Sequence, residues 1–306
     1  MDISKVVLTA VIVIACTWGI PAHSEIASLQ TKKEIGSMCQ RVIDIAMKRI
    51  KPHLAEYPDL QNKEDLVLLI PTADINAFAN HADQQILFPI MYCINIWYYA
   101  DALSQEYLTP SPQPKLGDYG EYLNDRRQET MKAGPVDNIT LMSYNDFISR
   151  ARKKLNPEDE RKRANMIDSA LVEGVMFVLG HEIGHLALKH KPYTEISSAE
   201  SQKQENAADH FSIQLLVSAK VSIIPALPSL MFFLEREASL KNIDPKNKTH
   251  PRAECRMERL VAYSGEINEL FKDSNNRNNF ERATGYSLAE YQNIMQDLKE
   301  DCRLNP

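Results

Sequence analysis

The chain has 306 residues, of which 44% are hydrophobic and 25% are charged, and this balance excludes a disordered or fibrous protein. Its 35 basic and 41 acidic residues give a net charge of −6, and no segment concentrates the positive charge that binding to a phosphate backbone requires. We therefore expect no nucleic acid among its partners. The length is sufficient for one large domain that buries its own core.

The first residues have the pattern of a secretory signal. Residues 6–20 form a mostly apolar run, and the small residues Ala22 and Ser24 precede a cleavage point after Ser24. The run is shorter than the roughly 20 residues that span a bilayer. We expect a signal peptide at 1–24 and an exported mature domain at 25–306, either periplasmic or secreted.

Cysteine usage agrees with export. Cys16 lies in the leader, where it loosely fits a lipid-attachment box, so a membrane-anchored lipoprotein stays open as an alternative. We expect membrane association only through this N-terminal segment or a lipidated Cys16. An even number of cysteines in an exported chain predicts two disulfide bonds, with three possible pairings, and four free buried thiols are the alternative. The four mature cysteines are Cys39, Cys93, Cys255 and Cys302.

Apolar spacing predicts the elements of the N-terminal half. Helical periodicity, short apolar runs between turn residues and a longer apolar stretch indicate, in this order, a helix, three short strands and a buried helix. The ranges are 34–54 for the first helix, 66–70, 75–79 and 86–89 for the strands, and 90–106 for the second helix.

Proline and charge are frequent in the next segment. At about 109–164 five prolines and few apolar clusters indicate a polar insertion with a short helix near 144–155. Such an insertion forms either a lid over an active site or a surface excursion. The helices expected after it occupy 157–191, in one or two pieces, 198–219, 223–240, 251–263 and 287–301.

The motif His-Glu-x-x-His occupies residues 181–185. Two histidines four residues apart on a helix project from one face, so His181 and His185 can bind one Zn²⁺, while Glu182 reaches the water on that metal. Two exposed helix histidines are the alternative. The flanking His190 and His210 are not expected to bind the metal, because the five-residue spacing directs His190 away from that face.

A third ligand is expected about 20 residues later. Glu205 and Asp209 share one helix face, which allows Glu205 to bind zinc and Asp209 to accept the second ring N–H of a ligand histidine. A solvated acidic face is the alternative reading, and Glu195 and Glu200 are rival ligands. Three ligands and one open position are what catalytic zinc requires.

The order of these motifs resembles the M48 family of gluzincin metallopeptidases. The shared features are His-Glu-x-x-His at 181–185, Glu-x-x-x-Asp at 205–209, Thr-His-Pro at 249–251 followed by Arg256, and residues 75–79, which resemble the family's strand over the cleft. A phage-exclusion peptidase has similar motifs. The chain departs from the family pattern in its longer polar insertion and in having no further membrane span.

The resemblance implies a role for each matching residue. His181, His185 and Glu205 would bind zinc, Glu182 would be the general base, and Asp209 would support a ligand histidine. His250 and Arg256 would lie near the cleft and stabilise the transition state, although Pro251 also suits the start of a helix. The strand with Asn76, Ala77 and Phe78 would bind substrate.

These observations predict an α+β, mostly helical zincin-type domain with a small edge sheet over the active-site cleft. We expect an exported endopeptidase with one zinc ion per chain, which hydrolyses protein or peptide substrates through a zinc-activated water and serves in protein quality control. A zinc-stabilised binding or chaperone module with a latent or closed protease site is the alternative.

Overall fold

The computed structural model describes 32–72, 74, 76–111, 115–133, 141–150, 154–222, 255–256, 258–259, 262, 272, 274 and 288–304. The predicted signal peptide, Cys16, His250 and the predicted helix at 223–240 lie outside the described residues. Within those described parts, no helix combines the length and the apolar character that crossing a membrane requires.

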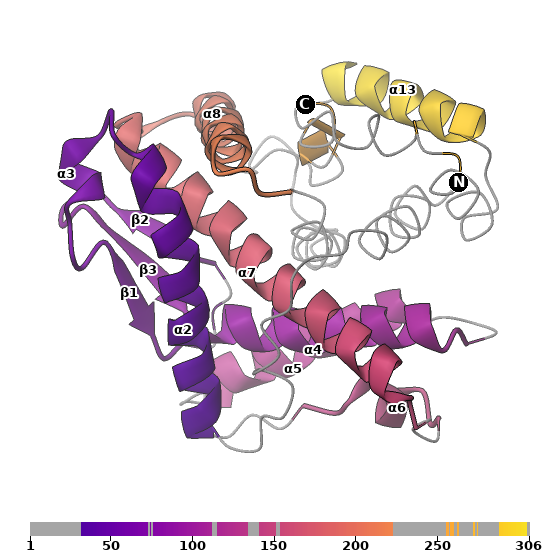
Figure 1. The fold of residues 1–306 in the computed structure, drawn as a ribbon. Coiled ribbons are helices and arrows are strands. Elements are labelled where there is room, and N and C mark those ends of the chain that lie inside the picture. The colour runs from indigo at the N-terminus through magenta and orange to yellow at the C-terminus, as the bar shows by residue number, and fades with distance from the viewer. Residues whose placement is uncertain are drawn as a thin grey trace.

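The described fold is mostly helical with one small sheet (Figure 1), in agreement with the predicted α+β class. The strands are β1 (Val67–Ile70), β2 (Phe78–Asn80) and β3 (Gln85–Pro89). The α-helices are α2 (Lys32–Ile50), α3 (Pro58–Gln61), α4 (Ile90–Leu108), α5 (Leu116–Ala133), α6 (Tyr144–Phe147), α7 (Pro157–Ala187), α8 (Ser198–Ser218) and α13 (Leu288–Leu304), and the 3-10 helices are η1 (Lys51–His53) and η3 (Tyr193–Glu195).

The sheet has the order β1-β3-β2, with β3 parallel to β1 and antiparallel to β2. Ile86 and Phe88 of β3 are buried, whereas Leu68 of β1 and Phe78 of β2 are exposed on the other face. Alternate residues of a strand point to opposite faces, so one face packs on the core. As the last strand in this order, β2 is the edge that contacts α7.

The strand predicted at 75–79 begins later than expected. β2 spans Phe78–Asn80, because polar side chains form hydrogen bonds with the backbone that precedes it. The N–H of Asp74 donates to the Thr72 hydroxyl, and the N–H of Asn76 donates to the Asp74 carboxylate. Such local side-chain bonds compete with strand pairing and delay it.

Helix α5 was not predicted from the sequence, and it lies within the proposed 109–164 insertion. Leu116, Tyr119 and Leu123 on one face of α5 are buried, and Tyr119 packs edge-on against Tyr144 at 5.2 Å between ring centroids. The many charged residues of this segment made its apolar residues look too sparse for a helix with a buried face. The described parts of this segment therefore contribute to the core, and α6 ends at Phe147 instead of near residue 155. The lid stays a prediction.

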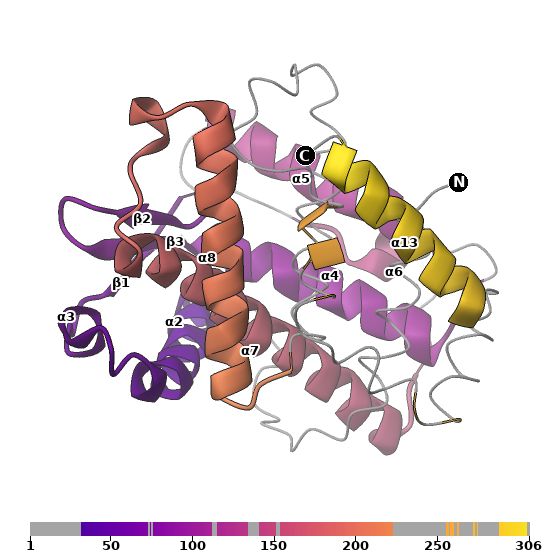
Figure 2. The ribbon, with the colours of Figure 1, turned by 90° about the horizontal axis from the view of Figure 1, so that it is seen from above.

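The central element is α7, a single continuous helix that contacts α2, α4 and α8 (Figures 1 and 2). Its start agrees with the sequence prediction: the Asn156 side chain accepts the Asp159 N–H, and Pro157 occupies the first turn. A buried ion pair joins it to α4, because Arg163 Nη2 lies 2.6 Å from Asp101 Oδ1.

Two glycines allow α7 and α8 to approach each other closely. A Cβ atom at Gly180 would lie 2.6 Å from the Ser212 hydroxyl oxygen, and one at Gly184 would lie 3.1 Å from the Ala208 Cα. The Ser212 hydroxyl donates to the Phe177 carbonyl at 2.7 Å, so the polar group at this contact is satisfied. Small residues on both helices therefore set the distance between them.

Four cysteines form two disulfide bonds, as predicted. Cys39–Cys93 joins α2 to α4, and Cys255–Cys302 joins the residue next to Arg256 to α13. In the chain-entropy model, closing loops of this size stabilises the folded state by roughly 4 kcal/mol each.

We predict that Gly184→Ala destabilises the protein by about 1–3 kcal/mol, because the new methyl group meets backbone and must push α8 away. Gly36→Ala, within helix α2, is the matched control. A Cβ atom at Gly36 would lie 3.5 Å from the Ile90 side chain, an ordinary van der Waals contact. The control should be neutral or stabilising by up to about 1 kcal/mol, because alanine favours helix more than glycine. Denaturant unfolding measures both, and equal effects of the two substitutions would contradict the close-contact explanation.

Candidate metal centre

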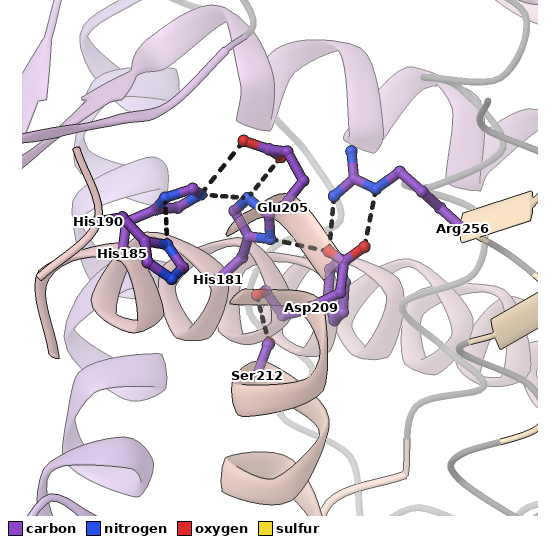
Figure 3. Close-up of polar contacts among 8 residues, drawn as sticks. His181, His185, His190, Glu205, Asp209, Ser212 and Arg256 are labelled. Carbon is purple, nitrogen blue, oxygen red and sulfur yellow. Dashed lines mark hydrogen bonds and ion pairs between the residues drawn. The ribbon is translucent and has the colours of Figure 1, made fainter. Parts of the chain in front are cut away.

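Three potential metal ligands converge from two helices. His181 and His185 project from α7, and Glu205 projects from α8 onto both rings (Figure 3). One ligand atom from each residue can be chosen so that all three lie within 4.8 Å of one another. His181 and Glu205 are buried and His185 is partly exposed, so this group lies at the margin of the core. The rival ligands Glu195 and Glu200 are exposed.

The spacing of the donor atoms suits a tetrahedral ion. The two Nε2 atoms lie 3.1 Å apart, and Glu205 oxygens lie 3.3 Å from His181 Nε2 and 3.4 Å from His185 Nε2. Two donors about 2.0–2.1 Å from a tetrahedral zinc ion are separated by about 3.3 Å. The donor set and its spacing therefore fit a small divalent cation.

His181 is held from behind by a chain of polar contacts. Its Nδ1 lies 2.8 Å from Asp209 Oδ1, and Asp209 in turn receives Arg256 Nη2 at 2.6 Å and Nε at 2.9 Å (Figure 3). A ring whose Nδ1–H donates to a carboxylate presents its Nε2 lone pair to the metal. Asp209 therefore fixes both the orientation and the tautomer of His181.

The charges around His181 and Asp209 favour the binding of a cation. Burial disfavours the charged ring, but the hydrogen bonds to Asp209 and Glu205 outweigh it and raise the pKa of His181 to about 10. Burial also opposes ionisation of Asp209, yet Arg256 and His181 hold the pKa of Asp209 below its ordinary value. The site without metal is thus electrostatically prepared for a positive charge.

Glu182 lies beside these ligands and contacts the edge strand. The backbone N–H of Ala79 in β2 donates to the Glu182 carboxylate. Burial and the repulsion of Glu205 outweigh the attraction of His181 and the Ala79 hydrogen bond, and they raise the pKa of Glu182 to about 7. A carboxylate with this pKa exchanges protons readily near neutral pH.

The other predicted site residues have different positions. Arg256 binds Asp209 through two nitrogens, and its predicted role at the transition state stays a prediction. His250 lies outside the described residues. Asn76 and Ala77 precede β2 and are half-buried, while Phe78 at the start of β2 is 47% exposed.

Sequence reasoning did not anticipate the contact between His190 and His185. The two Nδ1 atoms lie 3.0 Å apart. Burial and the neighbouring His185 lower the pKa of His190 to about 4, so its ring is neutral at physiological pH. His81 follows β2 directly, and burial and His185 lower its pKa. Helical spacing could not predict this contact, because His190 lies beyond the end of α7 in a turn that returns it to His185.

Comparison with known proteins agrees with a peptidase. Residues 141–269 match the model of the family Peptidase U49, and this range contains the three potential ligands and Arg256. The match indicates a peptidase family domain and a proteolytic function in general. No curated protein and no solved structure matches the chain.

We predict that Asp209→Asn lowers metal affinity or activity on the order of 10–100-fold, because an amide no longer fixes the His181 tautomer. Arg256→Met should weaken metal binding in the wild-type background but have little further effect in the Asp209→Asn background, since it acts through that carboxylate. Titration against a chromophoric chelator measures each affinity.

Arg259→Met is the control, because the Arg259 Nε donates to the Cys255 carbonyl. If Arg256→Met lowered kcat at full metal content and unchanged metal affinity, Arg256 would act at the transition state, as the sequence pattern predicts.

Proposed function

We propose that the protein is an exported zinc metalloendopeptidase similar to the M48 gluzincins. The observation that carries this proposal is the convergence of His181, His185 and Glu205 beside Glu182, at spacings that suit a tetrahedral ion. A structural three-ligand site has no use for an adjacent buried carboxylate, whereas a hydrolytic site needs a base there. The peptidase family match over residues 141–269 supports the same reading.

Zinc is the metal that this donor set favours. Two imidazoles and one carboxylate form a set typical of catalytic zinc, with the fourth position left for water or substrate. When bound, zinc supplies a Lewis acid that polarises the scissile carbonyl and lowers the pKa of water. His181, His185 and Glu205 would hold it.

The chain's own residues perform the proton transfers. Glu182 accepts the proton of the attacking water and then delivers it to the leaving amine. Its burial and its raised pKa keep the carboxylate basic enough for the first transfer and acidic enough, once protonated, for the second. The Ala79 N–H orients the carboxylate by donating to it.

The edge of β2 that faces away from β3 would bind the substrate backbone. Ala79 directs its N–H at Glu182, so the alternation of the strand directs the polar backbone groups of Phe78 and Asn80 toward β3. Peptides add to such an edge as an extra strand through main-chain hydrogen bonds. Binding through the main chain depends little on the substrate's side chains, so many different unfolded sequences could bind. This low selectivity suits the clearance of misfolded proteins.

Export is proposed from the leader together with the disulfides. The two cross-links, Cys39–Cys93 and Cys255–Cys302, are of the kind that persists in oxidising compartments. We infer a periplasmic or secreted enzyme, with the lipoprotein anchored at Cys16 as the alternative.

We predict that Glu182→Gln abolishes peptide hydrolysis while about one zinc ion per chain remains bound. Glutamine keeps the volume of the side chain but cannot accept the water proton. Glu205→Gln should instead weaken zinc binding, because a charged ligand becomes a neutral one. Casein cleavage and metal analysis of the purified protein measure both properties. Glu200→Gln, at an exposed rival ligand, is the control and should change neither.

Intact proteolysis in Glu182→Gln would overturn the peptidase mechanism. A wild-type protein that binds zinc tightly yet cleaves no unfolded substrate would point instead to the zinc-stabilised binding module.

We predict that Ala77→Pro raises KM at nearly unchanged zinc content. Ala77 lies two residues before Ala79, and in a substrate strand paired along β2 its N–H would be the next donor on that side, which proline removes. The residue is at the margin of the sheet and outside the β2–β3 pairing, which limits the effect on folding. Steady-state kinetics on an unfolded protein substrate test this, and an unchanged KM would place the substrate elsewhere.

A further inference from the structure

The end of α7 folds the chain back onto a metal ligand. Lys189 has φ 54°, a left-handed conformation that glycine usually supplies. The Lys189 N–H donates to the Leu186 carbonyl at 3.2 Å, and the His190 N–H donates to the His185 carbonyl at 3.0 Å. These two bonds form a Schellman motif, which places the residue after the turn against the residue five positions earlier. Here those two residues are His190 and His185.

The side chains of this pair are joined as well. The two Nδ1 atoms lie 3.0 Å apart, with the rings nearly perpendicular at 79° (Figure 3). Two lone pairs at this distance would repel, so one of the two nitrogens carries the proton.

The direction of this hydrogen bond follows from the other side of His185. Its Nε2 faces His181 Nε2 and Glu205, where the metal would lie. A neutral ring with an unprotonated Nε2 carries its proton on Nδ1, and His190 Nδ1 lies within hydrogen-bond distance of this N–H. His190 Nδ1 therefore accepts, and His190 carries its own proton on Nε2.

We propose that His190 is a positioning residue that holds His185 in its metal-binding tautomer and orientation. The proposal rests on the proposed metal centre. The two ligand histidines would then have different hydrogen-bond acceptors at Nδ1. His181 donates to the Asp209 carboxylate, and His185 donates to the neutral His190 ring. The left-handed Lys189 is the backbone feature that places this imidazole there.

The test compares His190→Leu with His190→Asn in the purified full chain. Leucine removes the acceptor, whereas the Asn Oδ1 occupies nearly the position of the His Nδ1 and restores it. We expect zinc affinity, measured against a chromophoric chelator, to fall about 10–100-fold in His190→Leu and to recover largely in His190→Asn. His53→Leu, at an exposed histidine in η1, is the control and should leave affinity unchanged.

A spectroscopic measurement separates positioning from packing. In the cobalt-substituted protein, the ring N–H protons of both ligand histidines should give exchangeable, strongly shifted NMR signals. His190→Leu should lose or broaden one of them through faster solvent exchange, and His190→Asn should keep both. The thermal midpoint of the metal-free protein should be nearly the same in the two variants.

Each other outcome decides against the proposal. Wild-type affinity in His190→Leu would show that His185 needs no acceptor, while the metal centre itself would stand. Equal weakening in His190→Leu and His190→Asn would assign His190 a packing role. A wild-type chain that binds no divalent metal would overturn the metal centre and this proposal together.

Discussion

The candidate site depends on the close approach of α7 and α8. Gly180 and Gly184 on one helix face Ser212 and Ala208 on the other, and no larger side chain fits between them. On α7 the two glycines directly precede His181 and His185, and on α8 Ala208 lies within one turn of Glu205. Glu205 reaches the two histidines because the helix axes are this close, so helix packing and ligand geometry are set by the same small residues.

Polar contacts behind the ligands then remove the remaining rotational freedom. Arg256 binds Asp209, Asp209 binds His181, and His190 contacts His185. Imidazole rings have two nitrogens and two tautomers, so a ligand histidine without such support samples states that cannot bind a metal. The layer of residues behind the ligands is therefore as much a part of the site as the ligands are.

Segments distant in the sequence meet at this point. The edge strand β2 supplies a backbone donor to Glu182, and the segment next to Cys255 supplies Arg256. The disulfide Cys255–Cys302 ties that segment to α13, while Cys39–Cys93 ties α2 to α4, which flanks α7. Covalent links thus support both sides of a site whose central helix is also held by the buried Arg163–Asp101 pair.

The sequence by itself determined what depends on local spacing. The i, i+4 histidines of α7 and the carboxylates on one face of α8 follow from helical periodicity, and the predicted start of α7 at 157 agrees with the structure. Tertiary structure decided what depends on close contact and on turns. These features are the later start of β2, the buried face of α5 and the pairing of the cysteines. The contact of His190 with His185, through the left-handed Lys189, is another. Periodicity describes one element at a time, whereas these features arise where elements end or meet.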